Sequence, residues 1–131
     1  MKIIVTGSDQ STLTTLRPDR EEVRSTFIDT AEQYGGRDQY MSPGETLLGT
    51  VGACMSLTVR GFLKQEGIPF EEVTITVTAD FGEGLTRIHT DTQVTGSLSP
   101  EERARVQEVL SGCALCKLLQ GRILLDHHPV R

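Results

Sequence analysis

One segment limits the folds open to this chain more than any other, the stretch from Ser42 to about Glu66. It begins with Ser-Pro-Gly-Glu, in which Ser42 suits the N-cap, Pro43 suits the first helical position, and Glu45 completes a capping box. Apolar residues then occur on nearly every side of the predicted helix, which should stop at Gly67. Such a helix has to be buried on almost all sides. Because the chain offers only one other helix to cover it, we expect a long central helix inside a homodimer.

Composition narrows the class of protein further. A chain of 131 residues fits a single domain, residues 1–131. Its content of 37% hydrophobic and 24% charged residues is typical of a globular protein. The net charge is −5 and the basic residues are scattered, which argues against nucleic acid and against an anionic membrane as partners. The N-terminal residues do not resemble a signal peptide, so we expect a cytoplasmic protein.

The other strands and the second helix are predicted from the alternation of apolar and polar residues, from β-branched residues, and from turn and capping signals. The alternation of Val and Thr over residues 71–79 is the clearest strand pattern. A second capping box starts at Ser99 and predicts a helix to about Leu119, whereas residues 31–41 should form a loop. The predicted strands are residues 2–6, 12–16, 22–29, 71–79, 85–97 and 122–126. The fold class is therefore α+β with a mainly antiparallel sheet, in the order βββ-α-ββ-α-β.

Three cysteines are the residues best able to carry chemistry. An odd number in a reducing compartment indicates free thiols and not a disulfide framework. Cys54 lies in the middle of the buried helix, where a thiol either packs as a small apolar residue or reacts if a pocket opens to it. Cys113 and Cys116 form a C-x-x-C pair that we place near the C-terminal end of the second helix. There the helix dipole opposes a thiolate, which argues against a thioredoxin-type dithiol.

Two further groups have both a structural and a functional interpretation. Cys113 and Cys116 could bind zinc together with His127 and His128, but adjacent histidines point apart in an extended chain. We therefore expect no metal and no other cofactor. Glu45 could assist a reactive thiol, although its position three residues after Ser42 already explains it as part of a helix cap.

Several sequence blocks together resemble the OsmC/Ohr superfamily, the osmotically inducible protein C and organic hydroperoxide resistance proteins. The first two are SPGETLL at 42–48 and GACMSLT at 52–58, in the central helix. GIPFEEV at 67–73 and LSPEER at 98–103 follow, and Cys113 comes later. The resemblance covers residues 35–125, and the order and spacing of the blocks make it specific.

The resemblance implies an OsmC-like fold, an intertwined homodimer with two long central helices, and a thiol peroxidase that acts in oxidative or osmotic stress. It identifies Cys54 as the cysteine that attacks an organic hydroperoxide and Cys113 as the cysteine that resolves it, with a dithiol as reductant. The family's peroxidases carry Glu directly after the proline, where this chain has Gly44 followed by Glu45. They also use an N-terminal arginine beside the thiolate. The arginines open to that role are Arg17, Arg20, Arg24 and Arg37, of which Arg37 is favoured because its loop precedes the helix.

A second function from a different class stays open at this point. The chain could be a non-catalytic protein of the same fold that binds a small apolar ligand at the dimer interface, with its cysteines only packed. Gly44 in place of the family's glutamate favours this alternative, whereas the presence of both Cys54 and Cys113 favours the enzyme.

Overall fold

The predicted α+β class and antiparallel pairing are confirmed in a computed structural model, which describes residues 2–9, 11–20 and 22–131. Within these residues the chain forms a three-stranded sheet, a two-stranded sheet and three α-helices. By its internal contacts the chain divides into two compact units, Met1–Gly49 and Thr50–Arg131.

The first unit contains the predicted antiparallel meander. Strand β1 (Ile3–Ser8) pairs with β2 (Ser11–Pro18), and β2 pairs with β3 (Thr26–Ile28). The third strand is shorter than the predicted 22–29, because only Thr26–Ile28 finds partners on β2. The predicted loop 31–41 contains one short 3-10 helix, η1 (Glu32–Tyr34).

The long helix α1 (Pro43–Gln65) has the predicted ends. At its start the backbone N–H of Ser42 donates to the Glu45 carboxylate at 2.8 Å, and the backbone N–H of Glu45 donates to Ser42 Oγ at 3.3 Å. At its end Gly67 has a φ of 65°, which an L side chain rarely adopts, and the N–H of Ile68 donates to the Leu63 carbonyl at 2.9 Å. The capping box and the glycine stop are therefore both confirmed.

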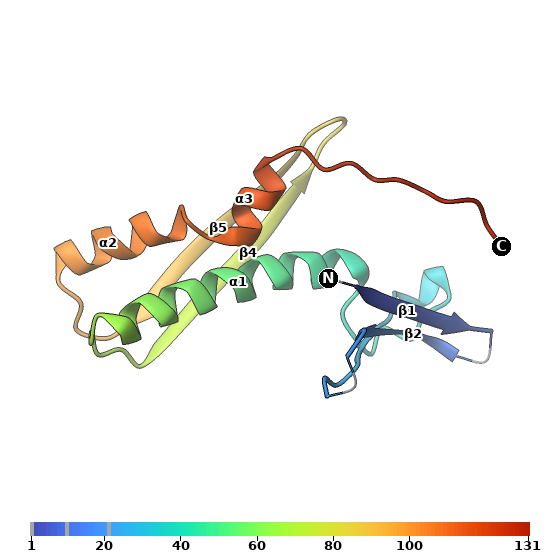
Figure 1. The fold of residues 1–131 in the computed structure, drawn as a ribbon, viewed down its shortest axis with the longest axis horizontal. Helices are drawn as coiled ribbons and strands as arrows, with labels where there is room; N and C mark the ends of the chain where they lie inside the picture. The colour runs from blue at the N-terminus through green and yellow to red at the C-terminus, as the bar shows by residue number, and fades with distance from the viewer. Residues whose placement is uncertain (1, 10, 21) are drawn as a thin grey trace. The chain divides into compact units, whose positions relative to one another are not determined.

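The core of the second unit lies between helices and one face of a hairpin. Strands β4 (Glu72–Phe81) and β5 (Thr86–Thr95) pair with Val73 opposite Val94. Figure 1 shows α1 and α2 (Pro100–Leu110) extending along this hairpin. The apolar side chains of β4 face the helices, whereas its threonines are exposed. The buried residues of this core are Val51, Met55, Val59, Leu63, Ile68, Leu98, Val106, Leu110 and Cys113.

A glycine sets how closely α1 approaches β4. Gly52 is buried, and a Cβ atom built on it would lie 3.1 Å from Val77 Cγ2 and 3.7 Å from Ile75 Cγ2. Real Cβ contacts are rarely so short, so α1 packs at a separation that only glycine allows at this point. Gly52 precedes Cys54 by two residues, and this contact therefore holds that part of the helix against the hairpin.

The prediction of one helix from Ser99 to Leu119 is wrong. Helix α2 ends at Leu110, and a separate helix α3 (Ala114–Gln120) follows. Between them the N–H groups of Ser111, Gly112 and Cys113 bond to carbonyls three residues back, as in a tightened last turn. Ser111 Oγ also donates to the Glu108 carbonyl at 2.6 Å. The chain turns at Ser-Gly, and Cys113 becomes the N-cap residue of α3.

The predicted last strand, 122–126, is also wrong for the single chain. These residues have no regular secondary structure, and the side chains of Leu124 and Leu125 are 78% and 77% exposed. A strand needs a neighbouring strand to bond its backbone groups, and the described residues provide none for this segment.

Helix α1 leaves much of its apolar surface uncovered by its own chain. By length and composition alone it could cross a membrane, a test that the core helices of soluble proteins also pass. Only 28% of its most apolar stretch is buried. Leu57 on this helix is 64% exposed, although the sequence predicts burial on nearly all sides.

Candidate functional site

Two of the predicted site residues, Cys54 and Cys113, lie in contact. Their sulfur atoms are 3.3 Å apart, and both cysteines are free thiols. A disulfide bond is about 2.05 Å long, so a small rotation of either side chain would close it. The contact joins residues that are 59 positions apart in the chain. The structure therefore places a potential disulfide pair between the middle of α1 and the start of α3.

The two thiols differ in their access to solvent. Cys54 is half-buried on α1, next to the buried Met55, and its carbonyl accepts a hydrogen bond from Thr58 Oγ1 at 2.9 Å. Cys113 is fully buried in the core of the second unit, with an exposed fraction of 0%. A molecule that enters from solvent therefore meets Cys54 before it meets Cys113.

The surroundings of Cys113 stabilise its thiolate. Burial raises the pKa of the Cys113 thiol, but four hydrogen bonds together lower it below its ordinary value. Two come from the backbone N–H and the thiol of Cys116, one from the Cys54 thiol and one from the backbone N–H of Leu115. The sequence placed Cys113 where a helix dipole would oppose the thiolate. That placement is wrong, because Cys113 is the N-cap residue of α3, at the end of a helix where the dipole favours a thiolate.

Cys116 completes a cluster of three thiols. Burial, the hydrogen bond to Cys113 and the charges of Cys113 and Cys54 together raise the pKa of Cys116 to about 11. Of this C-x-x-C pair, Cys113 therefore loses its proton first and Cys116 keeps its own as a donor. The sequence pattern assigns no role to Cys116. The Ser-Gly turn at 111–112 was the signal that could have placed both cysteines at the start of a helix.

A cavity of about 400 Å³ opens beside Cys116 in the second unit. Its lining is mostly polar and comes from β5, α2 and α3, with Met55 from α1. The lining residues are Met55, Thr90, Asp91, Thr92, Gln107, Leu110, Ser111, Cys116 and Gln120. Among the described residues that line this cavity, Cys116 is the one thiol.

The two supporting residues belong to the first unit. Glu45 is exposed, and its carboxylate accepts a hydrogen bond from the backbone N–H of Ser42. This bond and a second one from the Ser42 side chain lower the pKa of Glu45. Its structural interpretation as a cap therefore has direct support. The exposed Arg37 follows η1, and its backbone N–H donates to the buried Asp29 carboxylate at 3.2 Å.

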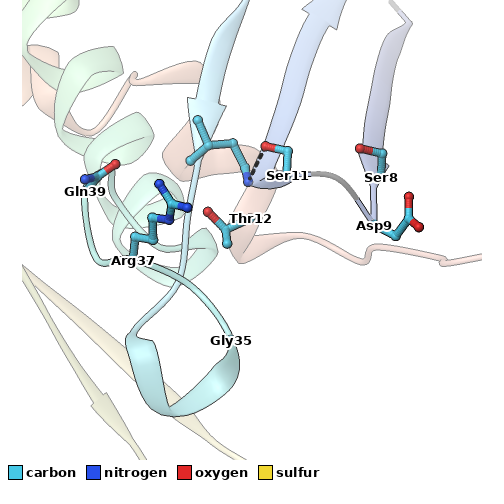
Figure 2. Close-up of a pocket in the computed structure, with 8 residues that line it drawn as sticks. Ser8, Asp9, Ser11, Thr12, Gly35, Arg37 and Gln39 are labelled. Atoms are coloured by element: carbon cyan, nitrogen blue, oxygen red, sulfur yellow. Dashed lines mark hydrogen bonds between the residues drawn. The ribbon is translucent and has the colours of Figure 1, made fainter.

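The side chain of Arg37 lines a pocket of about 590 Å³ within the first unit (Figure 2). The pocket lies between the end of β1, the start of β2 and the loop after η1. Figure 2 shows Arg37 and Gln39 on that loop, facing Thr12 and Ser11. The residues that line the pocket are Ser8, Asp9, Ser11, Thr12, Leu13, Gly35, Arg37 and Gln39.

Metal ligands do not gather in the part of the chain that the structure describes. Within residues 2–9, 11–20 and 22–131, no three His, Cys, Asp or Glu side chains are grouped so as to hold an ion. His127 and His128 are exposed in the segment that follows α3.

Comparison with known proteins gives a family and a set of similar folds. Residues 36–128 match the family model described as OsmC-like protein. An OsmC-like protein from Mycoplasma pneumoniae is 18% identical, with a TM-score of 0.73 over 92% of this chain and 86% of that one. The organic hydroperoxide resistance protein OhrB of Bacillus subtilis is 19% identical, with a TM-score of 0.59 over 92% and 90%. An organic hydroperoxide resistance protein from Elizabethkingia anophelis is 17% identical, with a TM-score of 0.62 over 92% and 89%. No curated protein matches the chain.

Proposed function

This chain belongs to the OsmC family, and from that premise we propose that it reduces organic hydroperoxides with a pair of thiols, Cys54 and Cys113. The observation that carries the proposal is the 3.3 Å contact between the two sulfur atoms. Two thiols in contact can give up two electrons and form one disulfide without a large movement of the backbone. Cys54 attacks the peroxide because its sulfur is the more accessible of the two.

In the first step the Cys54 sulfur attacks one peroxide oxygen, and the O–O bond breaks. The thiolate form of a cysteine is the nucleophile, so the Cys54 thiol gives up its proton before the attack. The leaving alkoxide takes up a proton and departs as an alcohol. Cys54 is then a sulfenic acid, so its sulfur has been oxidised by two electrons and the peroxide reduced.

In the second step the Cys113 sulfur attacks the sulfur of the Cys54 sulfenic acid. The S–O bond breaks, hydroxide leaves with a proton as water, and the disulfide forms. A dithiol reductant then opens this disulfide by exchange, returns two thiols to the protein and becomes a disulfide itself. The proposal places this cycle in the cytoplasm, where protein thiols are kept reduced.

The organic part of the substrate would lie on apolar surface. Leu57 follows Cys54 by three residues and so lies on the neighbouring turn of α1, with 64% of its side chain exposed. An alkyl or aryl group that covers this leucine gains about 25 cal/mol per Å² of apolar surface removed from water. Hydrogen peroxide has no such group, so we expect the enzyme to prefer organic hydroperoxides.

The proposal includes a homodimer. It is supported by apolar side chains that the single chain leaves in water, among them Leu47 on α1 and Leu124 and Leu125 after α3. A partner could also supply the neighbouring strand that residues 122–126 lack. Sedimentation at micromolar concentration should show a dimer, and a stable folded monomer would contradict this part of the proposal.

Peroxide consumption with a dithiol reductant tests the function. Cumene hydroperoxide loss is followed for the wild type, Cys54→Ser and Cys113→Ser, with Ser56→Ala as the control on α1. We expect Cys54→Ser to abolish turnover and the control to retain it, whereas Cys113→Ser, treated without reductant, should consume one equivalent and leave Cys54 as a sulfenic acid. A folded wild type that consumes no peroxide would favour the alternative, a ligand-binding protein with packed cysteines.

A further inference from the structure

We propose that Cys116 is a third redox thiol, which takes over the disulfide from Cys54 and presents it to the reductant. The inference rests on the proposed function, because it needs the disulfide between Cys54 and Cys113 as its starting point. It assigns a role to the residue that a two-cysteine cycle leaves unused. The reductant in question is a dithiol, the same class that the proposed cycle already requires.

The geometry of the cluster supports this exchange. The sulfur of Cys113 lies 3.3 Å from that of Cys54, and Cys116 packs against the same core to which Cys113 belongs. Cys113 and Cys116 are the N-cap and the third residue of α3, and side chains so spaced meet across the first turn. Cys113 can therefore form a disulfide with either neighbour while its own position changes little.

Burial explains why a transfer would be useful. Cys113 is 0% exposed, so a reductant cannot reach its sulfur directly. Cys116 faces a cavity of about 400 Å³ with a mostly polar lining. A disulfide that includes Cys116 has one sulfur at this cavity, which a small dithiol can enter and attack.

The order of the steps follows from the charges in the cluster. In the reduced protein, burial, the hydrogen bond to Cys113 and the nearby thiolate charges raise the pKa of Cys116 to about 11, so this thiol is protonated and unreactive. Once Cys113 is in a disulfide with Cys54, neither sulfur carries a charge. The contributions of those charges to the Cys116 pKa are then absent, and burial is the main remaining cause of its high value. Oxidation of the first pair therefore makes Cys116 easier to ionise.

The exchange balances without any further oxidant. The Cys116 thiol loses its proton, and its sulfur attacks Cys113 in the Cys54–Cys113 disulfide. The bond between Cys113 and Cys54 breaks as the bond between Cys113 and Cys116 forms, and Cys54 leaves as a thiolate that takes up a proton. No net oxidation occurs, and Cys54 is free to attack a second peroxide. The external dithiol then reduces the Cys113–Cys116 disulfide.

Disulfide mapping in the wild type tests the inference without any variant. Reduced protein receives one equivalent of cumene hydroperoxide and no reductant, and residual peroxide is measured. Samples are acid-quenched at intervals, alkylated with N-ethylmaleimide and digested with trypsin. Cys54 then lies in peptide 38–60, whereas Cys113 and Cys116 share peptide 106–117.

We expect the two peptides to be joined early, with Cys116 alkylated. Later, peptide 106–117 should be two hydrogens lighter with Cys54 alkylated. If peroxide is consumed but the joined peptides persist as the final product, the transfer to Cys116 is wrong. If no peroxide is consumed, the proposed function fails instead. The same mapping after oxidation with diamide then tests the exchange by itself, and a lasting Cys54–Cys113 link would overturn it.

A pair of variants measures what the transfer contributes. Oxidised Cys116→Ser should be reduced by dithiothreitol at least tenfold more slowly than the wild type, because its disulfide has no sulfur at the cavity beside residue 116 and the reductant can attack it only at Cys54. Leu118→Ala changes an exposed residue of the same short helix and should be reduced at the wild-type rate. Equal rates for Cys116→Ser and the wild type would contradict the inference.

Discussion

Replacement of Gly52 by alanine should destabilise the protein, although alanine is the better helix former. In the interior of a helix Gly→Ala contributes about 1 kcal/mol of stability. At Gly52 the new Cβ would lie 3.1 Å from Val77 Cγ2, and Val77 is β-branched and cannot easily turn away. Overpacking of this kind costs about 1–3 kcal/mol. We therefore expect a net loss of about 1 kcal/mol for Gly52→Ala.

Gly61 provides the matched control on the same helix. A Cβ atom built on Gly61 meets nothing within 4 Å, so Gly61→Ala should raise stability by the full gain of about 1 kcal/mol. For a chain of this length 1 kcal/mol corresponds to about 4 °C in Tm. Thermal and urea unfolding should therefore separate the two variants by about 2 kcal/mol, or about 8 °C. Equal stability of the two would refute the close packing of α1 on β4.

Three further substitutions test separate parts of the fold by urea unfolding. Burial raises the pKa of Asp29, but backbone hydrogen bonds from Thr30, Gln39 and Arg37 and the Arg37 charge lower it below 3.8. This carboxylate therefore stabilises the protein above its unfolded pKa and loses that effect as the pH falls through the lower folded pKa. The wild type should accordingly exceed Asp29→Asn in stability at pH 7 and lose its advantage in acid. Leu63→Ala removes a fully buried side chain and should cost about 3 kcal/mol, and a loss below 1 kcal/mol would contradict its place in the core. Ser99→Ala removes the Oγ that accepts the Glu102 N–H at 3.1 Å and should cost about 1 kcal/mol, whereas no change would show that this cap is unimportant.

Local patterns in the sequence predicted the elements that depend on local interactions. The capping boxes at Ser42 and Ser99 predicted where α1 and α2 begin, because a cap is satisfied within four residues. The alternation over 71–79 predicted β4, because the period of a strand is two residues. Gly67 likewise predicted the end of α1, since its positive φ suits glycine.

Elements that depend on distant or absent partners were harder to predict. The apolar run at 122–126 has strand-forming residues, but its backbone has no neighbour among the described residues of this chain. The break between α2 and α3 is hard to predict because the apolar spacing continues past the Ser-Gly pair to Cys113. That one error also misplaced the C-x-x-C pair relative to a helix end.

The candidate site could be predicted in part. Nothing in the spacing of Cys54 and Cys113 shows that they meet, because 59 residues separate them. The pair was identified by resemblance to a family, and the structure then brought the two sulfurs together. The placement of Cys113 and Cys116 on the first turn of α3 depends on the turn before that helix, so only the structure could reveal it. The roles of Glu45 and Arg37 beyond capping and loop contacts stay predictions.

A thiol count before and after oxidation tests the central claim most directly. The reduced chain has three free cysteines. Titration with Ellman's reagent in denaturant should find three thiols per chain in the reduced protein and one after a single equivalent of cumene hydroperoxide. The transfer to Cys116 does not alter that count, since exchange conserves disulfides. Three thiols remaining after treatment would show that Cys54 and Cys113 are packed and inert, and would contradict the account.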